Sequence, residues 1–191
     1  MAKIESSFKN MALSLTLISL VASAGLGSVY ELTKAPIELS NLNNKIEAIK
    51  QVVPEFNNNP YEEMLRLPTG EGEVLDVYPA KMNGAIVGYA INTYTKEGFS
   101  GDILLMAGFN TDGSIYNITV LEHKETPGLG SKMNESSFKD QFKNLNPSTT
   151  ALKIKKDNGQ IDAITAATIS SRAFCDAVQR AYSTLEKGGL I

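Results

Sequence analysis

The sequence predicts an α+β fold in which helices pack on a twisted antiparallel sheet, preceded by a single N-terminal transmembrane helix. Three features support this prediction: an uncharged apolar run over residues 11–30, four strand-like segments between residues 74 and 121, and a helical repeat of apolar residues after Ile169. The chain has 191 residues. The part beyond the apolar run is large enough to fold as one domain with its own core.

Residues 11–30 contain no charged residue, and their length matches one bilayer crossing of about 20 residues. A cleaved signal peptide is the alternative, because Lys3 and Lys9 provide a basic start and Ala22-Ser23-Ala24 resembles a cleavage site. Retention is favoured because the apolar character continues beyond that site. The positive-inside rule then predicts that residues 1–10 are cytoplasmic and that the domain lies on the periplasmic, extracytoplasmic side of the cell inner membrane.

The segment after the apolar run is expected to divide into a linker and a helix. Residues 31–40 form the predicted linker, and the domain is predicted to cover residues 41–191. Apolar residues repeat at helical spacing over residues 42–53, and Pro54 marks the end of that helix. Residues 57–72 are rich in Asn, Pro, Gly and Glu, which predicts a loop with at most one helical turn.

Four strands are predicted, over residues 74–81, 85–94, 103–109 and 115–121. Asn83-Gly84 separates the first two and is a strong hairpin signal, and Asp112-Gly113 separates the last two. These short connections favour antiparallel pairing. Beyond the strands, residues 135–145 predict a short helix and residues 152–155 predict one further strand.

Composition excludes several classes of function. The net charge is -3 at pH 7 with no basic stripe, so nucleic acid is not expected as a partner. Cys175 is the only cysteine, which rules out an internal disulfide and a metal cluster held by several cysteines. It is expected to be a small buried residue. His123, the only histidine, is expected at the surface or at a strand end. No nucleophile–base set, Walker loop or dinucleotide fingerprint is present, so no catalytic or metal-binding residue is predicted.

The segment from Asp162 to Ser171 is rich in small and hydroxylated residues and opens into an amphipathic helix. The apolar positions of this helix are Ala173, Phe174, Ala177, Val178, Ala181, Tyr182 and Leu185, and the glycines that follow are Gly188 and Gly189. The free N–H groups and positive dipole end at such a helix start favour a phosphate, and small side chains let it approach. An ordinary N-cap is the simpler interpretation.

This segment resembles the flavinylation motif in the G subunit of the Rnf complex and in the related C subunit of the sodium-pumping NADH:quinone reductase. In that family the pattern is Asp, two residues, Ser or Thr, Gly, Ala and Thr, and it corresponds here to Asp162, Thr165, Ala166, Ala167 and Thr168. The last Thr carries FMN through a phosphoester bond, so the resemblance implies that Thr168 is the attachment residue. Ala166 replaces the usual Gly, which costs stability if the position needs a positive φ.

Two further segments strengthen the resemblance. The loop from Glu125 to Gly130 is similar to the family's Glu-Thr-Pro-Gly-Leu-Gly signature, and Gly98-Phe99-Ser100-Gly101 is similar to its Gly-Tyr-Ser-Gly turn. Each segment alone is also typical of an ordinary turn between strands. The resemblance implies that both approach the flavin ring. The expected cofactor-binding residues are therefore Thr168, Thr165, Ala166, Ala167, Ile169, Ser170, Glu125, Thr126, Gly128, Leu129 and Phe99.

The resemblance implies a membrane-anchored electron-transfer flavoprotein subunit with no complete activity alone. Its complex would couple electron transfer between ferredoxin and NAD to translocation of Na⁺ or H⁺. The implied partners are the other membrane and peripheral subunits of an Rnf-type complex, membrane lipid, and a flavin transferase that uses FAD and Mg²⁺ during maturation. The alternative is a non-redox, membrane-anchored binding or assembly module, in which the small-residue segment is only the start of a capped helix.

Overall fold

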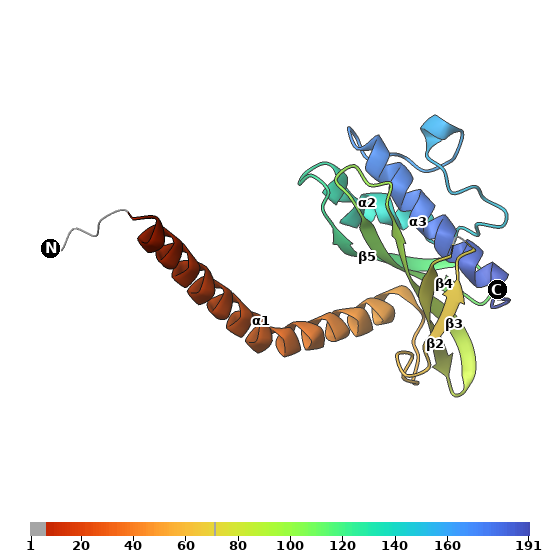
Figure 1. The fold of residues 1–191 in the computed structure, drawn as a ribbon. Coiled ribbons are helices and arrows are strands. Elements are labelled where there is room, and N and C mark those ends of the chain that lie inside the picture. Colours follow the sequence, from red (N-terminus) through yellow and green to blue (C-terminus); the bar gives the residue numbers. More distant parts are fainter. Residues whose placement is uncertain (1–6, 71) are drawn as a thin grey trace. The chain divides into compact units, whose positions relative to one another are not determined.

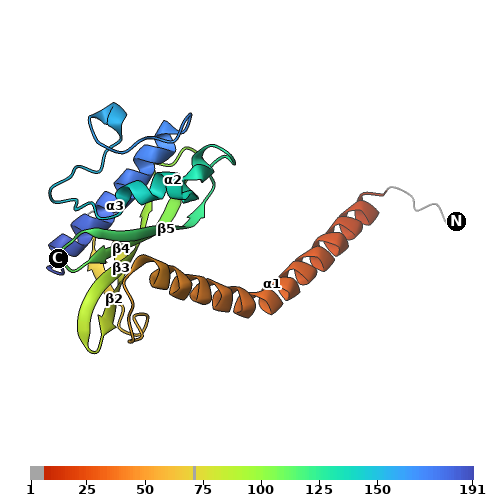
Figure 2. The same cartoon turned by 180° about the vertical axis from the view of Figure 1, so that it is seen from behind.

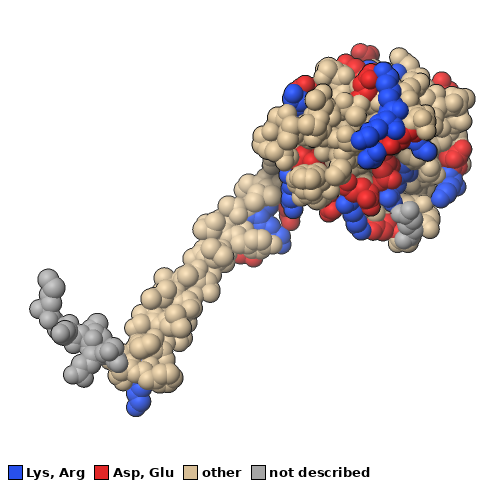
Figure 3. Space-filling model, turned by 90° about the horizontal axis from the view of Figure 1, so that it is seen from above, with Lys and Arg blue, Asp and Glu red and all other residues tan. Residues whose placement is uncertain are grey.

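The computed structural model describes residues 7–70 and 72–191. The chain forms two compact units, one that ends at Asn43 and one from Asn44 to Ile191. The first unit consists of most of α1, a helix that runs from Phe8 to Val52 (Figure 1). Among the described residues, α1 is the one helix long and apolar enough to cross a membrane. Figure 3 shows mainly uncharged residues along its outer part, and mixed acidic and basic side chains on the second unit.

Residues 31–40, predicted to be a linker, are helical and continue α1. Pro36 lies inside the helix, where it removes one backbone hydrogen bond at a cost of about 3 kcal/mol. The turn before it also carries a side-chain bond, since the Thr33 hydroxyl donates to the carbonyl of Val29 at 2.8 Å, a contact that often bends helices. The helix predicted over residues 42–53 is therefore the last part of α1, which ends at Val52 just before Pro54.

The second unit is built on one five-stranded antiparallel sheet in the order β1-β2-β3-β4-β5. The strands are β1 (Leu65–Pro68), β2 (Val74–Met82), β3 (Ala85–Thr95), β4 (Ile103–Asn110) and β5 (Ile115–His123). The four predicted strands are confirmed, and Asn83 and Gly84 form the tight turn between β2 and β3 with φ of 53° and 85°. Strand β1 was missed because it is a four-residue edge strand that ends in a proline.

Helix α3 (Thr168–Lys187) covers one face of the sheet (Figure 1). Its predicted apolar positions are buried, and it ends at Gly188, followed by Gly189 with φ of 67°. The Thr93 hydroxyl of β3 donates to the carbonyl of Ala177 at 2.9 Å, so a buried hydrogen bond fixes the helix on the sheet. The confirmed fold class is thus an α+β domain with a helix packed along its sheet.

The segments between β5 and α3 are short and irregular. They comprise η1 (Gly130–Asn134), α2 (Ser136–Lys139), η2 (Asp140–Phe142) and η3 (Lys155–Asp157). The helix predicted over residues 135–145 is therefore present as α2 and η2, which bury Phe138 and Phe142. The strand predicted over residues 152–155 was wrong, because Ile154 makes only an isolated bridge with Ile161 before the chain turns into η3.

The opposite face of the sheet is covered by the last turns of α1, which belong to the second unit (Figure 2). Ile49 and Val52 pack there against Tyr78 and Met106 in a second apolar cluster. Gly108 of β4 permits this close contact, since a Cβ at Gly108 would lie 1.5 Å from the carbonyl oxygen of Val52. A methyl group at this position therefore requires the end of α1 to move away from the sheet.

The close contact at Gly108 gives a test of this packing. Gly108→Ala is expected to lower the free energy of unfolding by about 2 kcal/mol, or roughly 4–8 °C in Tm. Thermal unfolding followed by circular dichroism in detergent measures the change. Gly25→Ala is the matched control, because no atom lies within 4 Å of a Cβ built there. Equal melting temperatures for Gly108→Ala and the control would contradict the packing described here.

Candidate functional site

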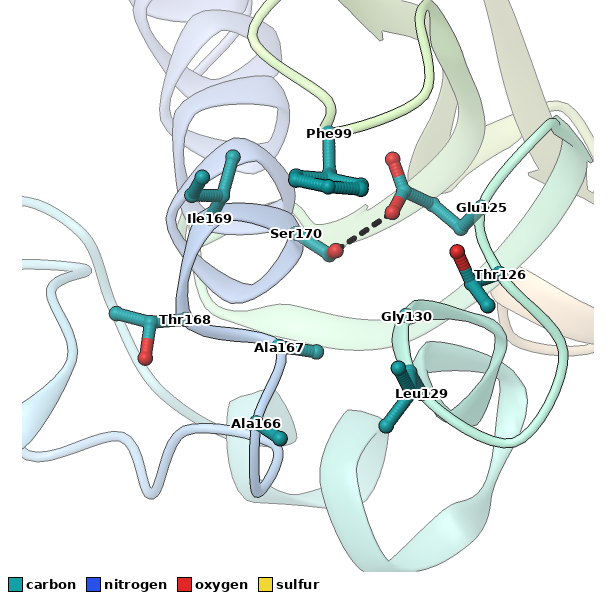
Figure 4. Close-up of a pocket in the computed structure, with 10 residues that line it drawn as sticks. All are labelled: Phe99, Glu125, Thr126, Leu129, Gly130, Ala166, Ala167, Thr168, Ile169 and Ser170. Carbon is teal, nitrogen blue, oxygen red and sulfur yellow. Dashed lines mark hydrogen bonds between the residues drawn. The ribbon is translucent and has the colours of Figure 1, made fainter.

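A pocket of about 300 Å³ lies where three separate segments meet at the start of α3 (Figure 4). The turn between β3 and β4 contributes Phe99, and the loop after β5 contributes Glu125, Thr126, Leu129 and Gly130. The start of α3 contributes the remaining lining residues, which are Ala166, Ala167, Thr168, Ile169 and Ser170. Segments that lie far apart in the sequence, from Phe99 to Ser170, therefore line one cavity.

Most of the residues expected at the site line this pocket, and two do not. Thr165 lines a separate hollow with Gln141 and Asp162. Gly128 is exposed at the tip of its loop with φ of 75°, where its role is to permit the turn. Gly130 also lines the pocket. It belongs to the loop from Glu125 to Gly130 that was expected to approach the flavin, but it was not named as a cofactor-binding residue. The three sequence segments identified separately are thus brought together by the fold.

The start of α3 offers unused hydrogen-bond donors. Ala167 occupies the N-cap position, and within the described chain no side chain caps the helix. The first backbone N–H groups, from Thr168 onward, therefore lack both an intrahelical acceptor and a capping oxygen. Ser171 points inward instead, accepting from the Ile164 N–H and donating to the Ala167 carbonyl, each at 2.9 Å. The interpretation of the segment as an ordinary capped helix is not supported by this geometry.

Thr168 is the first residue of α3, is partly buried and lines the pocket. In Figure 4 its side chain lies at the margin of the pocket and points away from Phe99 and Glu125. A group attached to the Thr168 hydroxyl would therefore start at the edge of the cavity. It would need a flexible arm to reach the space between Phe99 and Leu129.

Three apolar side chains around the pocket are exposed to solvent. Phe99 is 67% exposed, Ile169 47% and Leu129 40%. They come from three different segments and surround the opening of the cavity (Figure 4). Exposed apolar side chains that gather at one cavity are typical of a ligand-binding groove or of an interaction surface.

Glu125 joins the three segments of the pocket. Its side chain is buried, and its Oε2 accepts a hydrogen bond from the Ser170 hydroxyl at 2.7 Å. Its Oε1 accepts from the backbone N–H of Ser100 at 3.1 Å. The backbone N–H of Glu125 itself donates to Nδ1 of His123 at 3.2 Å, which fixes the start of the loop at the end of β5. His123 is thus at a strand end, as predicted.

Sequence reasoning missed the contact that holds the segment before α3. Gln141 accepts from the Asp162 N–H through Oε1 at 2.7 Å and donates to the Asp162 carbonyl through Nε2 at 3.2 Å. The Asp162 carboxylate forms an ion pair with Lys155 at 2.7 Å. The Asp162 carboxylate is therefore paired with Lys155, and it does not cap α3 in the described chain. No sequence signal could have identified Gln141, because it lies 21 positions from Asp162.

Two further observations concern the only cysteine and possible metal ligands. Cys175 is buried on α3, and burial raises the pKa of its thiol to about 12, so it is not a reactive thiolate at neutral pH. No group of three or more His, Cys, Asp or Glu residues within residues 7–70 and 72–191 could hold a metal ion.

Residues 98–183 match the family model of the FMN-binding domain. This range begins beside Phe99 and contains every residue that lines the pocket. The fold and the site thus define an FMN-binding domain that follows a long apolar helix.

Sequence similarity to known proteins covers most of the chain. The G subunit of the ion-translocating oxidoreductase complex of Aliivibrio fischeri is 32% identical over 91% of this chain and 88% of its own length. The corresponding subunit of Methanosarcina acetivorans is 35% identical over 92% of this chain and 94% of its own. The G subunit of the Na⁺-translocating ferredoxin:NAD⁺ oxidoreductase complex of Acetobacterium woodii is 32% identical, with 93% and 92% covered. The chain therefore belongs to the family of G subunits of ion-translocating, Rnf-type oxidoreductase complexes.

Ala166, where the expected motif has Gly, adopts φ of 61°. The left-handed conformation costs a residue with a Cβ about 1–2 kcal/mol. We expect Ala166→Gly to raise the free energy of unfolding by about 1 kcal/mol, since the strain removed exceeds the extra chain entropy of Gly. Thermal unfolding measures this change.

Ala163→Gly is the matched control for this substitution. Ala163 lies on the same segment, and its φ is not positive, so glycine there is expected to lower Tm. If both glycine variants lower Tm, the backbone at Ala166 is not strained, and the replacement of the motif's Gly by Ala costs no stability.

Proposed function

We propose that this protein is a membrane-anchored electron-transfer flavoprotein subunit that carries FMN on Thr168 through a phosphoester bond. The observation that carries the proposal is the pocket at the first turn of α3. It combines a threonine hydroxyl, uncapped helix N–H groups and exposed apolar side chains. Each of these features fits one part of FMN: the attachment point, the phosphate and the ring.

The phosphate fits the start of α3. Uncapped N–H groups and the positive end of the helix dipole stabilise a phosphate that is attached to the first residue of the helix. Ala166 and Ala167 precede Thr168, and their small side chains leave room for the phosphate oxygens. The exposed side of the segment also leaves the Thr168 hydroxyl accessible to a modifying enzyme before the flavin is in place.

The ring fits the opening between Phe99, Leu129 and Ile169. A flavin covers apolar side chains that would otherwise remain in water, and the face of Phe99 can pack against a flat ring. The hydroxyl of Thr126 and the buried carboxylate of Glu125 line one side of the same cavity. An apolar lining with a few polar groups is the usual composition of a cofactor pocket.

The bound flavin supplies the redox chemistry, and the protein supplies position, electrostatics and shielding from water. Covalent attachment has a physical reason if the domain lies outside the cytoplasm. Cytosolic FMN does not reach that compartment, so a flavin lost there is not replaced. A phosphoester is far from the ring and leaves its electronic structure nearly unchanged.

In this proposal the subunit works with the other membrane and peripheral subunits of an Rnf-type complex. One relative is named for Na⁺ translocation coupled to ferredoxin and NAD⁺. By this likeness, electrons pass through the FMN on a route between ferredoxin and NAD that is coupled to translocation of Na⁺ or H⁺. A flavin transferase using FAD and Mg²⁺ attaches the FMN, and α1 holds the subunit in the lipid bilayer.

Replacement of the attachment residue tests the central part of the proposal. Thr168→Val, co-produced with the flavin transferase, is expected to lose covalent flavin while the domain stays folded. In-gel fluorescence after denaturation measures the flavin, and circular dichroism measures the fold. Thr165→Ala is the control, because Thr165 lies in a different hollow, and we expect it to weaken labelling without abolishing it. Full fluorescence on Thr168→Val would refute the assignment.

Protease accessibility tests the proposed topology. One uncleaved span within residues 11–30 holds the chain in the inner membrane, with residues 1–10 in the cytoplasm and the flavin domain on the periplasmic side. Protease added to intact spheroplasts is therefore expected to digest the domain. Digestion only in inverted vesicles would reverse the orientation, and a soluble product that starts after Ala24 would identify a cleaved signal peptide.

A further inference from the structure

Glu125 is a buried carboxylate at the junction of the three pocket segments. It is 5% exposed, and both of its oxygens accept hydrogen bonds, from the Ser170 hydroxyl and from the Ser100 N–H. Accepting at both oxygens is the hydrogen-bonding pattern of an ionised carboxylate. Figure 4 shows its side chain between Phe99 and Thr126, with the carboxylate directed toward Ser170.

Two glycines enclose this carboxylate. A Cβ at Gly98 would lie 2.9 Å from Oε1 of Glu125, and a Cβ at Gly130 would lie 2.5 Å from Oε2 and 2.6 Å from the Ser170 hydroxyl. The backbone therefore approaches the carboxylate from the Phe99 turn and from the loop after β5. Glu125 has little freedom to move, and any shift of its side chain would displace the walls of the pocket.

The negative charge of Glu125 has no cation beside it. In the described part of the chain, no Lys or Arg forms an ion pair with Glu125, and the neighbouring Lys124 and Lys132 are exposed to solvent. Two neutral hydrogen-bond donors offset the desolvation of the carboxylate but leave its full charge in place. At low local dielectric, this charge acts on any group bound in the pocket.

We propose that Glu125 is a positioning residue that fixes the Phe99 turn against the start of α3, and that its charge lowers the reduction potential of the flavin in this pocket. The proposal rests on the proposed function. Reduction brings two electrons from an external donor onto the ring, and the accompanying protons come from water. Glu125 transfers neither electrons nor protons. It makes reduction less favourable because the added electron density lies near a fixed negative charge.

Removal of the charge at constant shape tests the electrostatic part. In Glu125→Gln the amide oxygen still accepts from Ser100, and the Ser170 hydroxyl can rotate to accept from the amide NH₂. In the full chain co-produced with the flavin transferase, we expect normal covalent loading and a higher midpoint potential in spectroelectrochemical titration at pH 8. The equilibrium constant for reduction should rise at least tenfold, about 30 mV for a two-electron couple. Glu122→Gln, an exposed carboxylate on β5, is the control and should leave the potential unchanged.

Removal of the hydrogen bonds tests the positioning part. Glu125→Ala loses both bonds and is expected to lower flavin loading at least threefold and to lower Tm, whereas Glu125→Gln restores both. Ser170→Ala keeps the carboxylate and its full charge but removes a hydrogen-bond dipole that opposes the field of that charge. This variant should therefore shift the potential in the opposite direction, to a lower value.

The outcomes separate this inference from the proposed function. If the unmodified sequence carries no flavin, the proposed function fails. If it carries flavin and Glu125→Gln leaves the potential unchanged at full loading, only the role of Glu125 is overturned. If Glu125→Gln does not load flavin, the test is the flavin midpoint potential of Ser170→Ala. A lower potential than in the unmodified sequence supports the role of Glu125, and an unchanged potential overturns it.

Discussion

The hydrogen bond from the Ser170 hydroxyl to the Glu125 carboxylate, 2.7 Å long, connects the start of α3 to the loop after β5. The second oxygen of the same carboxylate holds the Phe99 turn through the Ser100 N–H. These two bonds link three segments that the sequence keeps far apart. With them, one helix start and two loops form a cavity of about 300 Å³ with an apolar opening. The sheet positions the loops, and α3 contributes the Thr168 hydroxyl on which the proposed function depends.

Much of the fold could be predicted because each signal was local. Alternating strands, the Asn83-Gly84 turn and the helical repeat of α3 depend on neighbours within a few residues. Where the structure differs from the prediction, the local sequence signal was weak or misleading. Residues 31–40 look like a linker around Pro36, yet they are helical and belong to α1. Residues 65–68 carry little strand signal, but pairing with β2 makes them an edge strand.

The site was predictable as a set of segments, but not as a network of contacts. Motif resemblance identified Thr168, Glu125 and Phe99, and these line one pocket. It gave no indication that Ser170 binds Glu125, 45 positions away, or that Gln141 holds Asp162. Such pairs depend on the tertiary fold alone. The φ of 61° at Ala166 is also a tertiary result, and it explains why a motif with Gly at this position is the less strained form.

Peptide mass spectrometry of the chain, co-produced with the flavin transferase, locates the attachment residue. Trypsin cleaves after Lys156 and Arg172, so a single peptide contains both Thr165 and Thr168. We expect the peptide to carry the mass of one FMN less one water, and fragmentation to place this mass on Thr168. An unmodified peptide, or FMN located on Thr165, would contradict it.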